Sequence, residues 1–159
     1  MATPPLFDVS TLDLTRIALT KDEIRALNPQ RYEFEQLDAV VHLDLEHGLA
    51  VSIKHQRPDE FWVRGHIPGR PLMPGVMMIE MAAQTCSILY GKKFGDRDGH
   101  FFGFGGVTGV KFRGAVRPGQ TLVMVASTTL LKPRLARFNT QGFVEGALVF
   151  EGEITGVSL

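Results

Sequence analysis

Two side chains, His66 and Glu80, are of types that acid–base chemistry uses. A neutral histidine accepts a proton near physiological pH, and a carboxyl group can donate one. Glu80 falls inside a predicted apolar helix, where carboxylates are rare unless they are paired or functional. Gln84 follows one helical turn later, so its amide can hydrogen-bond to that carboxylate. These residues are the first candidates for a catalytic site.

The segment 66–84 that contains them has two halves with different expected structures. The first half carries a proline at every third position, which fixes φ, removes donors and predicts an extended or turning chain. Pro74-Gly75 stands where a helix begins. The run from Val76 to about Tyr90 has no glycine or proline and predicts a helix, with Gly91 as its C-terminal stop. This helix is apolar on nearly every face, so we expect it to be buried, and it is too short and too polar to span a membrane.

Alternating apolar and polar residues predict strands elsewhere in the chain. Two half-buried strands, at 41–45 and 49–54, are joined by a hairpin turn at Gly48, and a meander follows over residues 121–131, 136–145 and 147–156. The glycines among the aromatic residues of 101–106 indicate a bulge or a close approach by another backbone or ligand. One buried helix with about six mostly antiparallel strands gives the α+β class.

The N-terminal part carries weaker signals. Residues 1–20 are predicted to form an arm that packs loosely or on a partner, and residues 21–159 a single domain. A short helix over 21–27 is expected to begin with a capping box of Thr20 and Glu23. Residues 91–99 are expected to be a polar loop.

Composition narrows the function classes. At 159 residues, with 17 basic and 17 acidic side chains, the chain has no net charge and gives no indication of nucleic-acid binding. No apolar N-terminal run follows a basic start, so no signal peptide is expected. The one cysteine, Cys86, is expected in the core and fits a reducing, cytoplasmic compartment.

The pattern His-Ile-Pro-Gly-x-Pro-x-Met-Pro-Gly-Val-x-x-x-Glu-x-x-x-Gln, from His66 to Gln84, resembles the signature of the 3-hydroxyacyl-[acyl-carrier-protein] dehydratases of the FabZ/FabA group, closer to FabZ. The similarity extends over most of the domain. Departures are Gln30, where the family has a histidine, Ala39, where an arginine often follows the aspartate, and the first twenty residues, which have no counterpart. The resemblance implies a hot-dog fold, an antiparallel sheet wrapped around one long central helix.

The resemblance also implies a hydro-lyase reaction and a role for each candidate. A (3R)-3-hydroxyacyl thioester loses water to give the trans-2-enoyl thioester, in fatty acid or related acyl-chain biosynthesis, without metal or organic cofactor. His66 would be the base and Glu80 the acid. The Gly75 N–H would hold the thioester oxygen, the Val76 carbonyl would fix the His66 tautomer, and Gln84 would orient Glu80.

Further expectations concern the substrate and the assembly. An acyl tunnel is expected to be lined by Tyr32, Met73, Met77, Phe102 and Phe104. An acidic acyl carrier protein is expected to dock on a basic surface made by Lys92, Lys93, Arg97, Lys111, Arg113 and Arg117. The resemblance implies homodimers, often grouped as trimers of dimers, in which each site takes its histidine from one chain and its glutamate from the other. No nucleic-acid or membrane partner is expected.

Two other functions compete with the dehydratase. A hot-dog acyl thioesterase hydrolyses the same kind of thioester with a helix carboxylate, which would leave His66 without an obvious duty. A non-catalytic acyl-binding or scaffold subunit would keep only the fold, and the presence of both His66 and Glu80 argues against it. Acyl carrier protein and coenzyme A are both open as carriers.

Overall fold

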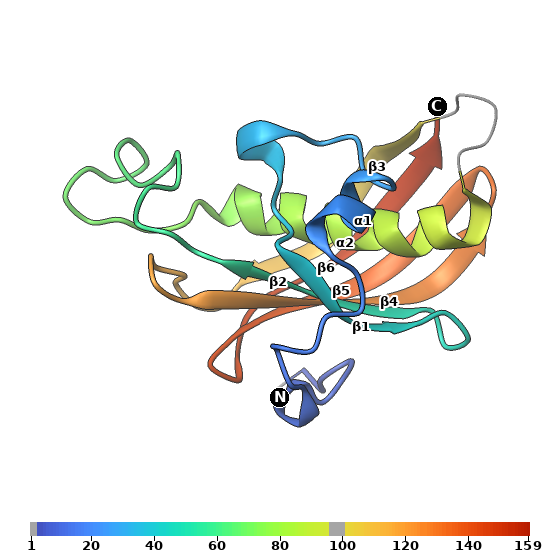
Figure 1. Cartoon of the computed structure of the whole chain (residues 1–159), viewed down its shortest axis with the longest axis horizontal. Coiled ribbons are helices and arrows are strands. Elements are labelled where there is room, and N and C mark those ends of the chain that lie inside the picture. Colours follow the sequence, from blue (N-terminus) through green and yellow to red (C-terminus); the bar gives the residue numbers. More distant parts are fainter. Residues whose placement is uncertain (1–2, 96–100) are drawn as a thin grey trace.

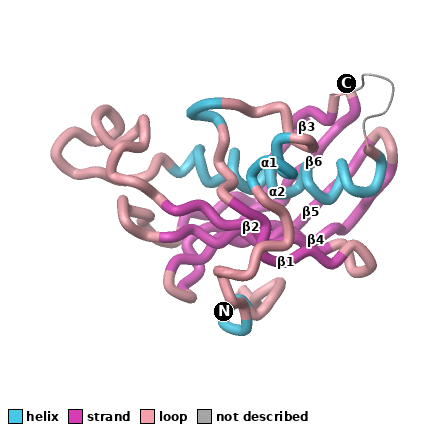
Figure 2. Tube along the Cα trace, viewed as in Figure 1, coloured by secondary structure: helices cyan, strands magenta, loops and turns pink. Residues whose placement is uncertain are grey.

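The computed structural model describes residues 3–95 and 101–159 and shows one long helix lying across a curved antiparallel sheet (Figures 1 and 2). The sheet has six strands in the order β1-β2-β4-β5-β6-β3. Their bounds are β1 (Ala39–Asp44), β2 (Leu49–His55), β3 (Phe102–Phe112), β4 (Thr121–Lys132), β5 (Leu135–Val144) and β6 (Ala147–Ser158). This arrangement confirms the predicted α+β class and the hot-dog architecture.

The helix α2 (Gly75–Phe94) is longer than the sequence predicts. The stop was expected at Gly91, and that expectation is wrong, as is the assignment of residues 91–94 to a polar loop. A glycine inside a helix costs about 1 kcal/mol, but Gly91 leaves room for the Leu27 side chain, which a β-carbon would approach at 3.2 Å. The helix ends one turn later at Gly95, with φ of 66° and its N–H on the Gly91 carbonyl at 2.7 Å. The remainder of the predicted loop, residues 96–100, lies outside the described residues.

Short helical segments precede the sheet: η1 (Val9–Thr11), α1 (Lys21–Arg25) and η2 (Tyr32–Phe34). The predicted capping box of α1 is present. Glu23 N–H donates to Thr20 Oγ1 at 3.3 Å, and Thr20 N–H donates to Glu23 Oε2 at 2.7 Å. The helix ends two residues before the predicted limit, because residue 28 precedes a proline and the chain leaves the helical conformation there.

The predicted strands and turns are confirmed, with ends that differ by a few residues. Gly48 has the positive φ, 64°, that its hairpin needs, and Glu145-Gly146 turns β5 into β6 with both residues at positive φ. The register of β3 against β6 shifts at Phe104 and Gly106, so the Gly/aromatic segment does contain a β-bulge.

The inner face of the sheet packs on α2 and forms the main core. Phe138, Phe150 and Met124 from the strands and Met81 and Ile88 from the helix are completely buried there. The sheet covers only part of the helix. One stripe, made of Val76, Glu80, Ala83, Ser87 and Gly91 at helical spacing, stays partly or fully exposed in the single chain. Among the described residues, no helix is long and apolar enough to cross a membrane.

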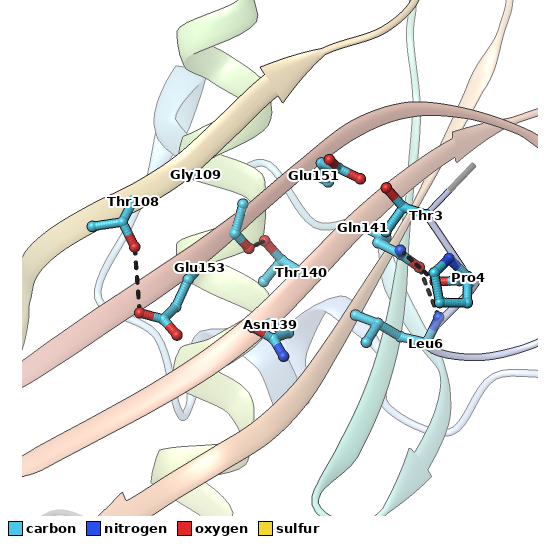
Figure 3. Close-up of a pocket in the computed structure, with 11 residues that line it drawn as sticks. Thr3, Pro4, Leu6, Thr108, Gly109, Asn139, Thr140, Gln141, Glu151 and Glu153 are labelled. Carbon is cyan, nitrogen blue, oxygen red and sulfur yellow. Dashed lines mark hydrogen bonds between the residues drawn. The ribbon is translucent and has the colours of Figure 1, made fainter. Parts of the chain in front are cut away.

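The outer face carries a second apolar cluster, and the N-terminal arm covers it (Figure 1). The sheet contributes Ala39, Val41, Val51, Ile53, Val123, Val125 and Phe143, and the arm contributes Leu6, Phe7, Val9, Leu12 and Leu14. Gln141 ties the arm down, because its Oε1 accepts from Leu6 N–H at 2.7 Å and its Nε2 donates to the Pro4 carbonyl at 3.0 Å (Figure 3). The arm thus packs on its own sheet instead of lying loosely.

A pocket of about 370 Å³ opens beside the arm, between β3, β5 and β6 (Figure 3). Glu151 lines it and bonds Arg113 at 2.8 Å and Lys111 at 3.4 Å. The Arg113 hydrogen bond is the main cause that lowers the pKa of Glu151 to about 2. These charges thus neutralise one another on the face of the sheet opposite α2.

Deleting residues 1–14 should expose the outer apolar cluster. We expect stronger binding of a hydrophobic dye, self-association and a melting temperature lowered by more than about 5 °C, since several apolar side chains lose their cover. Light scattering and thermal denaturation measure these effects. Deleting only residues 1–3 is the control, because it keeps the apolar arm. Unchanged dye binding and an unchanged melting temperature after the long deletion would show that the arm does not stabilise the sheet.

Candidate active site

His66 lies in the segment 56–74, which joins β2 to α2 and projects beyond the start of the helix at the left of Figure 1. Both ends of this segment are fixed. Near its start, Lys54 and Glu60 form a buried ion pair at 2.8 Å, and Trp62 is in the core. Near its end, Met73 is buried and donates its N–H to the Val116 carbonyl at 2.9 Å. The exposed part with His66 is therefore a constrained loop, as its prolines predicted.

The imidazole of His66 is oriented by its own segment. Its Nδ1 is 2.7 Å from the Leu72 carbonyl oxygen. Since a carbonyl only accepts, Nδ1 must carry the proton, and a neutral ring then has its lone pair on Nε2. The Val76 carbonyl was expected to fix this tautomer, but in this structure Leu72 supplies the partner. Nε2 of the exposed ring is free to act as a base.

The start of α2 provides unpaired donors. Helix N–H groups of the first turn have no intrahelical acceptor, and Gly75 is the first residue of α2. A β-carbon at Gly75 would meet the Phe112 ring at 2.9 Å, so glycine is needed here because β3 packs closely. Val76 follows with 66% of its surface exposed. The helix thus presents N–H groups and a positive dipole end at an open edge of the fold.

Glu80 is on the uncovered stripe of α2, one turn beyond Val76. It was predicted to be buried, but it is partly exposed, because the sheet does not reach this side of the helix. Gln84 Nε2 donates to Glu80 Oε1 at 2.8 Å, which confirms the predicted contact. Gln84 itself is buried, donates to the Phe34 carbonyl at 2.6 Å and accepts from Gln36 N–H at 3.0 Å. Each polar end of the Gln84 amide is therefore held, and Glu80 is oriented through it.

The turn that holds Gln84 is strained. Tyr32 has φ of 57°, a left-handed conformation that aromatic residues rarely adopt. This conformation starts η2, which directs the Phe34 carbonyl and the Gln36 N–H toward Gln84. The side chain of Tyr32 is 87% exposed. The backbone of Tyr32 therefore helps to position the turn that contacts Gln84. The sequence predicted only that the Tyr32 side chain lines the acyl tunnel.

A cavity of about 80 Å³ lies next to Glu80, between α2 and the bulged end of β3. Phe102 stacks on Tyr90 with ring centroids 3.8 Å apart, and it lies so close to Gly156 that no side chain fits there. The close approach predicted for the Gly/aromatic segment is thus present. The cavity is lined by Gln30, Glu80, Ala83, Gln84, Ser87, Phe101, Phe102, Gly103, Phe104, Ile154, Thr155 and Gly156.

The structure brings together only some of the predicted site residues. Phe102 and Phe104 share the cavity with Glu80 and Gln84. Met73 and Met77 are buried in the main core and do not line it. His66 does not line it either, so this cavity does not combine the two catalytic candidates of one chain. Gln30, which sequence reasoning treated only as a departure from the family, does line it.

The predicted docking residues lie on different parts of the fold. Lys92 and Lys93 are exposed in the last turn of α2. Lys111 and Arg113 share the carboxylate of Glu151. Arg117 is exposed near the turn at Gly119, and Arg97 lies outside the described residues. Within residues 3–95 and 101–159, no three histidine, cysteine, aspartate or glutamate side chains gather into a group that could hold a metal ion.

A family model described as the FabA-like domain matches residues 28–153. The chain is 35% identical to the 3-hydroxyacyl-[acyl-carrier-protein] dehydratase FabZ of Clostridioides difficile, over 86% of this chain and 94% of that protein. The chain belongs to the FabZ/FabA family of 3-hydroxyacyl-[acyl-carrier-protein] dehydratases. It is also 38% identical to the bifunctional enzyme LpxC/FabZ of Chlorobaculum tepidum, over 82% of this chain and 28% of that protein.

Solved structures agree on the hot-dog fold of this family. The dehydratase heterocomplex ApeI:P from Xenorhabdus doucetiae superposes with a TM-score of 0.72 at 16% identity, covering 86% of this chain and 90% of that one. A putative thioesterase from Ralstonia eutropha gives a TM-score of 0.65, also at 16% identity, covering 84% and 95%. At such identities the likeness establishes the fold alone.

Replacing Gln84 by methionine should loosen Glu80 without emptying the core, because the two side chains have similar volumes. We expect the turnover of a family substrate to fall about ten- to a hundred-fold with a much smaller change in KM, since the loss affects orientation of a reacting group. Steady-state kinetics with an enoyl thioester measures this. Gln120→Met is the control, because Gln120 is partly exposed, accepts a hydrogen bond from Arg117 N–H at 2.8 Å and does not line the cavity. Equal turnover in both variants would contradict the orienting role of Gln84.

Proposed function

We propose that this protein dehydrates (3R)-3-hydroxyacyl thioesters to trans-2-enoyl thioesters, as the names of its FabZ relatives state for those proteins. The observation that supports this most directly is the Glu80 carboxyl, held by Gln84 beside an aromatic-walled cavity on the same helix that begins at Gly75. The reaction belongs to fatty acid or related acyl-chain biosynthesis. We propose a cytoplasmic location, which the unpaired thiol of buried Cys86 supports.

The proposed reaction moves two protons in one site. Nε2 of His66 removes a proton from C2 of the acyl group, and the electron pair of that bond moves toward the thioester carbonyl. The C3–O bond then breaks with its electrons on oxygen, and Glu80 delivers the proton that converts the hydroxyl into water. Gln84 keeps the Glu80 carboxyl in place during this transfer.

The charge that develops on the thioester oxygen needs stabilisation. We propose that the N–H of Gly75 supplies it, because first-turn N–H groups lack helix partners and lie at the positive end of the helix dipole. Val76, one turn before Glu80, lies between this donor and the acid along the same side of α2. The thioester carbonyl is accordingly expected near the helix start, with C3 nearer to Glu80.

We infer that the working unit is a homodimer in which His66 comes from one chain and Glu80 from the other. The exposed stripe of α2, the unpaired edge of β3 and the projecting loop with His66 support this inference, because each needs a neighbour to complete it. A trimer of such dimers is the larger assembly expected.

The acyl carrier is proposed to be acyl carrier protein, with coenzyme A as the competing carrier. Lys92 and Lys93 are the favoured docking residues among the predicted ones, because they are exposed and form no ion pair within residues 3–95 and 101–159, whereas Lys111 and Arg113 are bound to Glu151. The assay below measures carrier preference when the same acyl group is supplied on acyl carrier protein and on coenzyme A.

His66→Ala and Glu80→Gln should each lower turnover by about two to four orders of magnitude, the usual range for a positioned acid or base. Mass spectrometry of enoyl and 3-hydroxyacyl thioesters incubated with purified protein measures the gain or loss of one water. Circular dichroism checks that both variants stay folded. Release of the free acid would instead identify a thioesterase, and unchanged thioesters would leave an acyl-binding scaffold. Near-normal hydration by either variant would refute its assigned role.

Mixing the two inactive chains should restore activity if the site is shared. In a mixed dimer of His66→Ala with Glu80→Gln, one site carries both lesions and the other carries neither. With random pairing, half of the dimers are mixed and half of their sites are intact, so about a quarter of wild-type activity should return. That value applies to the unfractionated mixture. Co-expression with two tags and tandem purification isolates the mixed form, from which about half of wild-type activity is expected because one of its two sites is intact. No recovery would mean that each site is built within one chain.

A further inference from the structure

Gln30 has a buried amide oxygen that the proposed mechanism does not yet use. It lies between α1 and η2 and lines the cavity that contains Glu80. Its Oε1 is shielded from solvent and has no hydrogen-bond partner among the residues that the structure describes. A buried acceptor left without a donor destabilises the fold, so the position is expected to gain a donor when the site is in use.

Two of the neighbouring side chains, Gln84 and Ser87, use their hydrogens elsewhere. Both amide hydrogens of Gln84 are engaged, one on the Phe34 carbonyl and one on Glu80. Ser87 donates its hydroxyl hydrogen to the Ala83 carbonyl at 3.1 Å. Gln30 Oε1 is therefore an acceptor that receives no hydrogen from these two side chains. The second oxygen of Glu80 becomes another acceptor once its proton has been transferred to the leaving oxygen.

We propose that Gln30 Oε1 accepts a hydrogen bond from the 3-hydroxyl group of the substrate, and then from the water that this hydroxyl becomes. The inference rests on the proposed dehydratase function. A leaving water has two O–H donors, and Glu80 and Gln30 offer two acceptors. As Glu80 protonates the oxygen ahead of complete C3–O cleavage, the oxygen gains positive charge and its hydrogen becomes more acidic, so the bond to Gln30 strengthens toward the transition state. Gln30 is thereby a catalytic residue specific to this chain's departure from the family histidine.

A second small cavity, of about 10 Å³, lies behind Gln84 and is lined by Asn28 as well as Gln30. Asn28 Oδ1 also has no partner within the described residues. A space of this size holds at most one water. In the competing explanation, a water bound permanently in this space donates a hydrogen bond to Gln30 Oε1 without any substrate. This explanation predicts that Gln30 does not affect the preference for a hydroxylated ligand.

The binding test uses the His66→Ala protein, in which the hydroxyacyl thioester persists. The affinity of this protein for the hydroxyacyl thioester is compared with its affinity for the matching saturated thioester, which lacks the 3-hydroxyl group. Adding Gln30→Met should weaken binding of the hydroxyacyl thioester about three- to ten-fold, the value of one lost hydrogen bond, while affinity for the saturated thioester stays unchanged. In the chain with His66 intact, Gln30→Met should lower kcat by a similar factor and alter KM less.

Gln56→Met is the matched control, because Gln56 is a buried glutamine whose amide also lacks partners among the described residues, yet it does not line this cavity. It should leave the preference for the hydroxyl unchanged. If Gln30→Met does not fold, Gln30→Asn withdraws the oxygen by one methylene and gives the same readout. Equal loss of affinity for both thioesters, or no loss, overturns the proposal. Preserved hydroxyl preference in a chain without turnover refutes the dehydratase function but supports the contact.

Discussion

The apolar surface of α2 is the constraint on which the rest of this structure depends. A twenty-residue helix with Met, Ala, Ile and Leu on most of its sides must be covered, and the curved sheet covers it along one side. The remaining stripe carries Val76, Glu80 and Ser87. The candidate acid therefore lies where the cover of the helix is incomplete, and we propose a second chain as the complement.

The side-chain amide of Gln84 orients the polar groups on this apolar helix. Gln84 bonds Glu80 on one side and the η2 turn on the other, so the carboxyl is oriented by backbone groups fifty residues earlier in the chain. The left-handed Tyr32 belongs to the same turn, and local strain of this kind persists where surrounding contacts fix it. The candidate acid Glu80 is thus held by a rigid scaffold and not by a flexible loop.

The two faces of the sheet are covered by different parts of the chain. The inner face packs on α2, whereas the outer face is covered by an arm that the sequence comparison with the family would not suggest. The side chain of Gln141, on the central strand β5, hydrogen-bonds to the backbone of the arm. These bonds join residues that lie more than 130 positions apart in the sequence. Such a contact stabilises the sheet on the face opposite α2, the helix that carries Glu80.

The sequence by itself determined the start of the helix, the strands and their turns, because prolines, glycines and apolar periodicity act locally, and the continuous motif from His66 to Gln84 supplied the candidate base and acid. It also determined the Glu80–Gln84 contact, which needs only one helical turn. Tertiary structure alone decided the rest. Packing of Leu27 at Gly91 extended α2, the limited width of the sheet left Glu80 partly exposed, and the core took up Met73 and Met77. Gln30 joined Glu80 through folding of distant segments, a placement that no local pattern encodes.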